Sequence, residues 1–188
     1  MNYDLSLLYT PTIKKFSNIK NCIRNLFVRS PKQDVFQCSI LDIHSKAKYP
    51  SNVLSNFHKS HFRFDDVEIH SMEGFLQSLK TSDLSLQRKI CLLEGIEAKK
   101  AGENLSEIYD KKHIFWNGKK MDRYSEEYQN LLKDVYLSKF NQDSLFRQAI
   151  KDTKDKKLVH SIGKQEKSET ILTEQEFIQN LVNLRNYL

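Results

Sequence analysis

The chain has 188 residues, of which 39% are hydrophobic and 29% are charged, and its formal net charge is +6. This length suffices for one domain with a sizeable core, and no apolar run is long enough to cross a bilayer. Five glycines and three prolines exclude collagen-like and glycine-rich disordered sequences. The three cysteines (Cys22, Cys38 and Cys91) are odd in number and widely spaced, so we expect reduced thiols in a cytoplasmic protein.

Residues 1–33 form the first predicted unit, a basic amphipathic helical extension. Thr10-Pro11 is a good helix start, because proline fits the first helical position. Apolar residues recur at helical spacing up to Pro31, and five basic residues accompany them: Lys14, Lys15, Lys20, Arg24 and Arg29. One interpretation is a helix that packs on the domain, and the other is a helix that docks on nucleic acid or on a protein partner.

Residues 34–188 form the second predicted unit, a helix-rich α+β single domain with a small antiparallel sheet. A strand is expected over 35–43, followed by a hairpin of Phe62-Arg63-Phe64 and Val67-Glu68-Ile69 around an Asp65-Asp66 turn. Helices are expected over 72–80, 83–94, 96–101 and 126–140, around 145–150, and from 174 to the end; a second strand is expected over 158–162. Thr173 and Glu176 form the pattern of a capping box before the last helix.

The helix after Ser71 carries the most informative pattern. Glu73, Gln77 and Lys80 share one face, because a helix repeats every 3.6 residues. A carboxylate, an amide and an ammonium on one stripe are consistent with the wall of an active site. The alternative is a solvated face, in which the acid of the first turn only complements the helix dipole.

The motifs of this region also stand in a specific order. Ser55-Asn56-Phe57 precedes the hairpin, His70-Ser71-Met72-Glu73 follows it, and Gln77, Lys80 and Trp116 come next. The order and spacing resemble the NADAR (YbiA-like) family of N-glycosidases over residues 34–188, which is most of the chain. The resemblance implies hydrolysis of the bond between a ribose and a nitrogen base in an ADP-ribosyl or ribosylamino conjugate, such as ADP-ribosylated guanine. It also implies a catalytic role for Glu73 and substrate-binding roles for Asn56, Phe57, Gln77, Lys80 and Trp116.

The resemblance has two clear departures. The family usually has histidine after the motif glutamate, where this chain has Gly74, and its glycine-rich C-terminal loop is not recognisable in residues 158–166. That loop is expected to form the wall facing Glu73, so the second acid or base stays open, with Asp122 and Glu166 as guesses. Trp116 could equally be a core residue.

Three function classes follow from these observations. The first is the N-glycosidase, the second a catalytically inactive module that binds ADP-ribose or another nucleotide, and the third a protein or nucleic-acid interaction protein. The expected partner is a small ribosyl conjugate or an ADP-ribosylated nucleic acid, with no membrane, and the oligomeric state is open. No cofactor is expected, and no metal site, because His58 and His61 lack ligand-spaced neighbours.

Overall fold

The computed structural model describes residues 39–105 and 109–188. The chain divides into two units, residues 1–36 and 37–188, and the described residues belong to the second. The helix expected within residues 1–33 lies outside the described residues. None of the helices in the described ranges is both long enough and apolar enough to span a membrane.

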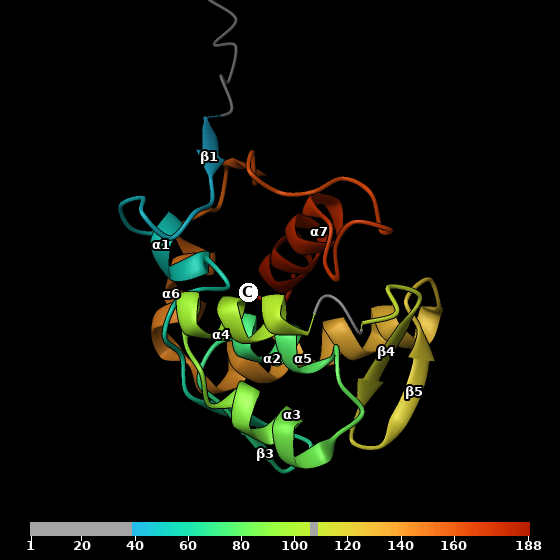
Figure 1. Ribbon diagram of the computed structural model, residues 1–188. Coiled ribbons are helices and arrows are strands. Elements are labelled where there is room, and N and C mark those ends of the chain that lie inside the picture. The colour runs from blue at the N-terminus through green and yellow to red at the C-terminus, as the bar shows by residue number, and fades with distance from the viewer. Residues whose placement is uncertain (1–38, 106–108) are drawn as a thin grey trace, which may run out of the picture. The chain divides into compact units, whose positions relative to one another are not determined.

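The strands of the described residues form three two-stranded sheets, and the hairpin of β4 and β5 is seen on the right of Figure 1. β2 (Phe62–Phe64) and β3 (Val67–Ile69) are antiparallel, as are β4 (His113–Trp116) and β5 (Lys119–Asp122). β1 (Ile40–Asp42) pairs with β6 (Lys157–Val159) in parallel. The α+β class is therefore confirmed, with the correction that one of the sheets is parallel. Residues 35–38 of the expected first strand lie outside the described residues.

The described residues contain seven helices. They are α1 (Ser51–Leu54), α2 (Met72–Ser78), α3 (Leu84–Cys91), α4 (Gly95–Asn104), α5 (Glu126–Gln142), α6 (Ser144–Lys151) and α7 (Glu174–Arg185). The hydroxyls of Ser71, Ser125 and Thr173 accept hydrogen bonds from the first turns of α2, α5 and α7, and Thr173 and Glu176 form the expected capping box. α3 begins one residue later than expected, because the Asp83 carboxylate caps its N-terminus. It ends at Cys91, three residues before the expected end.

The core lies on both sides of α2. Phe75 and Leu76 of α2, and Leu79 directly after it, are buried together with Leu132 and Val135 of α5. Each such side chain stabilises the fold by about 1.5–3 kcal/mol. α2 is thus a central helix, packed against α3 and α4 as well as the first hairpin, and its position is fixed by apolar contacts while its polar stripe stays available.

The β4–β5 hairpin is an element that the sequence analysis missed. Asn117 and Gly118 form its turn with φ of 47° and 79°. Asn-Gly is a strong hairpin signal, since both positions of such a turn need positive φ. The Asp65-Asp66 turn of the first hairpin was expected, and it has φ of 47° and 62°, which aspartate tolerates better than most residues.

Candidate functional site

The N-terminus of α2 is tied directly to the Ser55-Asn56-Phe57 loop. The backbone amide of Glu73 donates to the carbonyl oxygen of Asn56 at 2.9 Å. Ser71 accepts from Gly74 N at 2.9 Å and donates to the Leu93 carbonyl at 2.8 Å. These bonds hold the loop, the catalytic candidate Glu73 and the segment after α3 in one rigid arrangement, as the order of the motifs suggested.

Glu73 is a buried carboxylate with a single side-chain partner in the part of the chain that the structure describes. It is 9% exposed, and its Oε1 accepts from Gln77 Nε2 at 2.8 Å. Burial raises the pKa of Glu73 above its ordinary value of 4.5, although the Gln77 hydrogen bond and the charges of Lys80 and Lys99 act in the opposite direction. A desolvated carboxylate with one donor is poised to interact with a cation or a proton.

Glu73 and Gln77 face a cavity of about 450 Å³. Asn56 and Phe57 line it from the loop, and Lys99 lines it from α4. The opposite wall comes from the segment between β6 and α7: His160, Ile162, Gly163, Lys164 and residues 170–173. The expectation that this segment faces Glu73 is therefore correct, even though its sequence departs from the family pattern. Four of the predicted site residues, Asn56, Phe57, Glu73 and Gln77, share one cavity.

The opposite wall is fixed by a buried ion pair. Arg123 is 0% exposed and binds both carboxylate oxygens of Glu176, at 2.9 and 2.6 Å. Its Nε also donates to the Thr170 carbonyl at 3.2 Å, and the Tyr128 hydroxyl donates to the Ile171 carbonyl. The residues that face Glu73 are thus held by α5 and by the end of the second hairpin. Nothing in the sequence near Arg123 marked this role.

Lys80 lies in a neighbouring hollow rather than in the Glu73 cavity. Its Nζ donates to the Gly102 carbonyl at 3.1 Å and lies 5.8 Å from the centroid of the Tyr109 ring. The hollow, about 130 Å³, shares Gln77 and residues 170–171 with the main cavity. Burial lowers the pKa of Lys80, while the negative charge of Glu73 acts to raise it. Lys80 therefore influences Glu73 electrostatically.

Trp116 is packed on the other side of α2. It is 4% exposed, and its ring contacts Phe64 (centroids 5.9 Å apart) and Phe75 (4.9 Å). Its Nε1 donates to Asp65 Oδ2 at 2.7 Å. Phe75 lies two residues, roughly 200° around the helix, from Glu73. The structure therefore does not bring Trp116 to the Glu73 cavity, and its contacts are those of a core residue.

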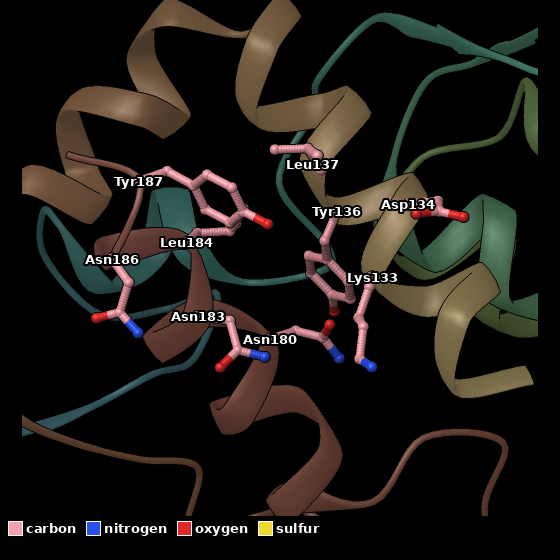
Figure 2. Close-up of a pocket in the computed structure, with 9 residues that line it drawn as sticks. All are labelled: Lys133, Asp134, Tyr136, Leu137, Asn180, Asn183, Leu184, Asn186 and Tyr187. Atoms are coloured by element: carbon pink, nitrogen blue, oxygen red, sulfur yellow. The ribbon is translucent and has the colours of Figure 1, made fainter. Parts of the chain in front are cut away.

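A second large cavity lies between α5 and the end of α7 (Figure 2). Its volume is about 500 Å³, and its lining includes Tyr136, Asn180 and Tyr187. Asp134, which is exposed, is the only carboxylate among the described residues that line it. The hydroxyl of Tyr136 donates to Asn56 Oδ1 at 2.8 Å, so Tyr136 separates the two cavities. Because this bond occupies Oδ1, the amide NH₂ group of Asn56 is the part of that side chain suited to bind a ligand.

Known proteins can now be compared with this geometry. A family model described as bacteriophage protein GP30.3 matches residues 48–186. The chain belongs to this family. A GP30.3-like relative from Enterobacteria phage T4, described as an uncharacterized 17.1 kDa protein in the Gp30-rIII intergenic region, is 38% identical over 151 residues, covering 80% of this chain and 99% of the relative.

A solved structure extends the comparison to the fold. The NMR structure of the E. coli protein YbiA matches with a TM-score of 0.54 and 20% identity, covering 84% of this chain and 89% of YbiA. The assignment of the chain to the YbiA-like NADAR type is confirmed by these two findings. At this identity the likeness to YbiA shows the fold alone, so chemistry must be argued from the residues of the cavity.

A second carboxylate does not face Glu73. Among the described residues, Glu73 is the only Asp or Glu that lines the cavity, and neither Asp122 nor Glu166 does. Two histidines, His44 and His160, do line it. His160 Nδ1 lies 2.6 Å from the Ile43 carbonyl and therefore donates to it, which leaves Nε2 to exchange a proton. The sequence analysis missed His160 because it searched for a carboxylate partner.

Proposed function

We propose that this GP30.3-family protein is an N-glycosidase that hydrolyses the bond between a ribose and a nitrogen base in an ADP-ribosyl or ribosylamino conjugate in the cytoplasm. The observation that carries the proposal is the state of Glu73. It is a nearly buried carboxylate that faces a cavity, and among the described residues Gln77 is the one side chain that hydrogen-bonds to it.

The chemistry follows from that environment. Cleavage of the N-glycosidic bond places positive charge on the sugar, and a fixed carboxylate in a low-dielectric site stabilises such a charge far better than it would in water. A raised pKa also makes Glu73 a better proton acceptor from an attacking water. His160 is proposed to protonate the departing base, since its orientation is fixed by the bond to Ile43.

The remaining lining suits a phosphorylated sugar. Lys99 and Lys164 bring positive charge to the cavity, and the Asn56 amide offers N–H donors to hydroxyl or phosphate oxygens. Phe57 is half-buried and lines the cavity. It therefore takes the place of Trp116 as the proposed contact for a flat base.

The decisive experiment compares the same substitution at two acids. Glu73→Gln should abolish hydrolysis of an ADP-ribosylated guanosine, a loss of roughly 10²–10³-fold or more, because it removes a preorganised charge. Glu97→Gln is the matched control, because Glu97 is an exposed acid in the first turn of α4. Full activity in a folded Glu73→Gln protein would refute the proposal.

A second candidate function is a binding module without turnover. One observation favours it: within residues 39–105 and 109–188, no second carboxylate lines the cavity beside Glu73. Calorimetry with ADP-ribose separates the two functions. Binding without turnover of any ribosyl conjugate, and tighter binding by Glu73→Gln as charge repulsion from phosphate disappears, would support the module.

The substrate could be carried on a polynucleotide, and salt dependence tests this. The +6 charge and the basic residues 14–29 motivate the comparison. Each phosphate neutralised by the protein releases counterions, so affinity for a modified polynucleotide should fall steeply with salt, whereas a free nucleotide shows a shallow dependence. Charge reversal of Lys14, Lys15 and Lys20 should flatten the slope only if this segment binds flanking phosphates.

A further inference from the structure

Two histidines lie side by side where the first hairpin opens. His61 precedes β2 and His70 follows β3, so they are the next cross-strand pair beyond Phe62 and Ile69. Their rings are stacked, with centroids 4.0 Å apart and an angle of 13° between planes. The backbone at this position is well fixed, because Ser60 N donates to the His70 carbonyl at 2.9 Å and His70 N donates to the Cys91 carbonyl at 2.8 Å.

A carboxylate completes the group. Glu94, the residue before α4, has Oε1 at 3.4 Å from His61 Nε2. One ligand atom from each of His61, His70 and Glu94 lies within 4.8 Å of the others. A second acid, Glu68, has Oε1 at 2.9 Å from His70 Nε2. Two imidazoles beside two carboxylates are a donor set that suits divalent transition metals and does not suit Mg²⁺ or Ca²⁺.

We propose that His61, His70 and Glu94 bind a divalent transition metal, with Zn²⁺ as the ion that fits best. Zn²⁺ accepts two histidines and one carboxylate, with water in the remaining position. Glu68 is proposed to orient His70 or to add an oxygen ligand. No metal site was expected here, because His58 and His61 lack ligand-spaced neighbours along the chain, whereas the hairpin pairs His61 with a residue nine positions later.

The site is separate from the Glu73 cavity, because none of its three ligands lines that cavity. Its place in the fold indicates a structural role. His70 stands one residue before Ser71, the cap of α2, and Glu94 directly precedes α4. A bound metal joins the hairpin to the starts of the two helices that carry Glu73 and Lys99, and so stabilises the folded chain by mass action.

Lys59 provides a graded test of this geometry. Its Nζ lies 2.8 Å from Glu94 Oε1 and competes with a metal for that carboxylate. Lys59→Gln should therefore tighten metal binding, while loss of a ligand should weaken it. Replacing an outer partner of a metal site typically costs roughly 10–100-fold in affinity, so loss of His61 or His70 should exceed that and Glu68→Gln should fall within it.

The experiment titrates the untagged full chain with Co²⁺ and then Zn²⁺. We expect one Co²⁺ per chain with visible absorption, displacement by Zn²⁺, and a rise in melting temperature. His61→Ala and His70→Ala should each weaken Co²⁺ binding by more than about 100-fold. His113→Ala is the matched control, because His113 also pairs with a carboxylate, Asp110, on the other hairpin.

Two outcomes would overturn the proposal. The first is no stoichiometric binding of either ion. The second is binding that survives the His61→Ala, His70→Ala double variant, or that shows a thiolate-to-cobalt charge-transfer band and disappears when Cys22 and Cys38 are replaced by serine. Circular dichroism of each variant without metal establishes that a loss of binding does not come from unfolding.

Discussion

Glu73 and Glu176 are two buried acids with opposite surroundings. Each lies in the first turn of a helix behind a hydroxyl cap, and they are 9% and 8% exposed. Glu176 is bound by Arg123, Gln129 and the Thr173 backbone, whereas Glu73 is bound by Gln77. Burial acts to raise the pKa of both, yet the Arg123 hydrogen bonds bring that of Glu176 down to about 2, and that of Glu73 stays raised.

The comparison teaches that burial alone does not mark a functional acid. A desolvated charge is costly unless it is paired, so Glu176 is structural and Glu73 is the one whose charge is left for a ligand. Cavity volume is a poorer guide, because the α5–α7 cavity, at about 500 Å³, is as large as the Glu73 cavity, at about 450 Å³.

The largest expected effect comes from Glu176→Gln. Removing one partner of a buried ion pair costs about 3–5 kcal/mol, because Arg123 is left with an uncompensated charge. Urea denaturation of parent and variant measures this loss. A loss of unfolding free energy no larger than that of an average surface substitution would mean that the Arg123–Glu176 pair does not hold the segment facing Glu73. The contrast between Glu176 and Glu73 would then fail.

The same substitution at Glu73 should stabilise the fold in a pH-dependent way. The raised pKa means that the folded state holds the proton more tightly than the unfolded chain, whose pKa is near 4.5. Between 4.5 and the folded pKa, the free energy of unfolding of the parent therefore falls as pH rises. Glu73→Gln lacks this titration.

Urea denaturation of parent and Glu73→Gln at several pH values checks the sign. The free energy of unfolding of the variant should rise relative to that of the parent as pH increases from 4.5 to the folded pKa. Above that pKa the difference between the two free energies should be constant. Glu176 contributes the opposite trend, since its stabilisation is complete above pH 4.5 and is lost as pH falls towards its folded pKa of about 2. A variant that loses stability as pH rises would contradict the assignment of an unpaired charge.

A smaller effect is expected from Gly102→Ala. A Cβ built on Gly102 would lie 1.7 Å from Gln77 Oε1, so the amide must move away from Glu73. Turnover should fall roughly tenfold, the equivalent of about 1.4 kcal/mol, with little change in melting temperature because alanine favours the helix. In a Gln77→Ala background the same substitution should have no further effect, and a full second loss there would place the cause elsewhere.

The smallest expected effect concerns Trp116, the single tryptophan of the chain. ADP-ribose should leave its emission unchanged, because its ring packs on Phe64 and Phe75 behind α2. A Phe57→Trp reporter in a Trp116→Phe background should be quenched instead. Quenching of the native tryptophan would show that the ligand occupies the other side of α2.

The sequence predicted what depends on local chemistry. The capping box of Thr173 and Glu176, the first hairpin and the shared face of Glu73 and Gln77 all follow from residue type and spacing. The second hairpin was also predictable, from Asn117-Gly118. The β1–β6 pair, the role of Arg123 and the His61–His70 contact were not, because each joins residues whose neighbourhood is decided by tertiary packing.

The place of Gly74 limits how this chain can change. A Cβ on Gly74 would lie 2.7 Å from the Leu93 carbonyl oxygen and 2.9 Å from that of Ile90, so the turn after α3 rests directly against the backbone of α2. The histidine that is usual in the YbiA-like family therefore cannot be restored by one substitution. It requires a prior shift of residues 90–93, and the order in which such changes could accumulate is constrained by a contact between two stretches of main chain.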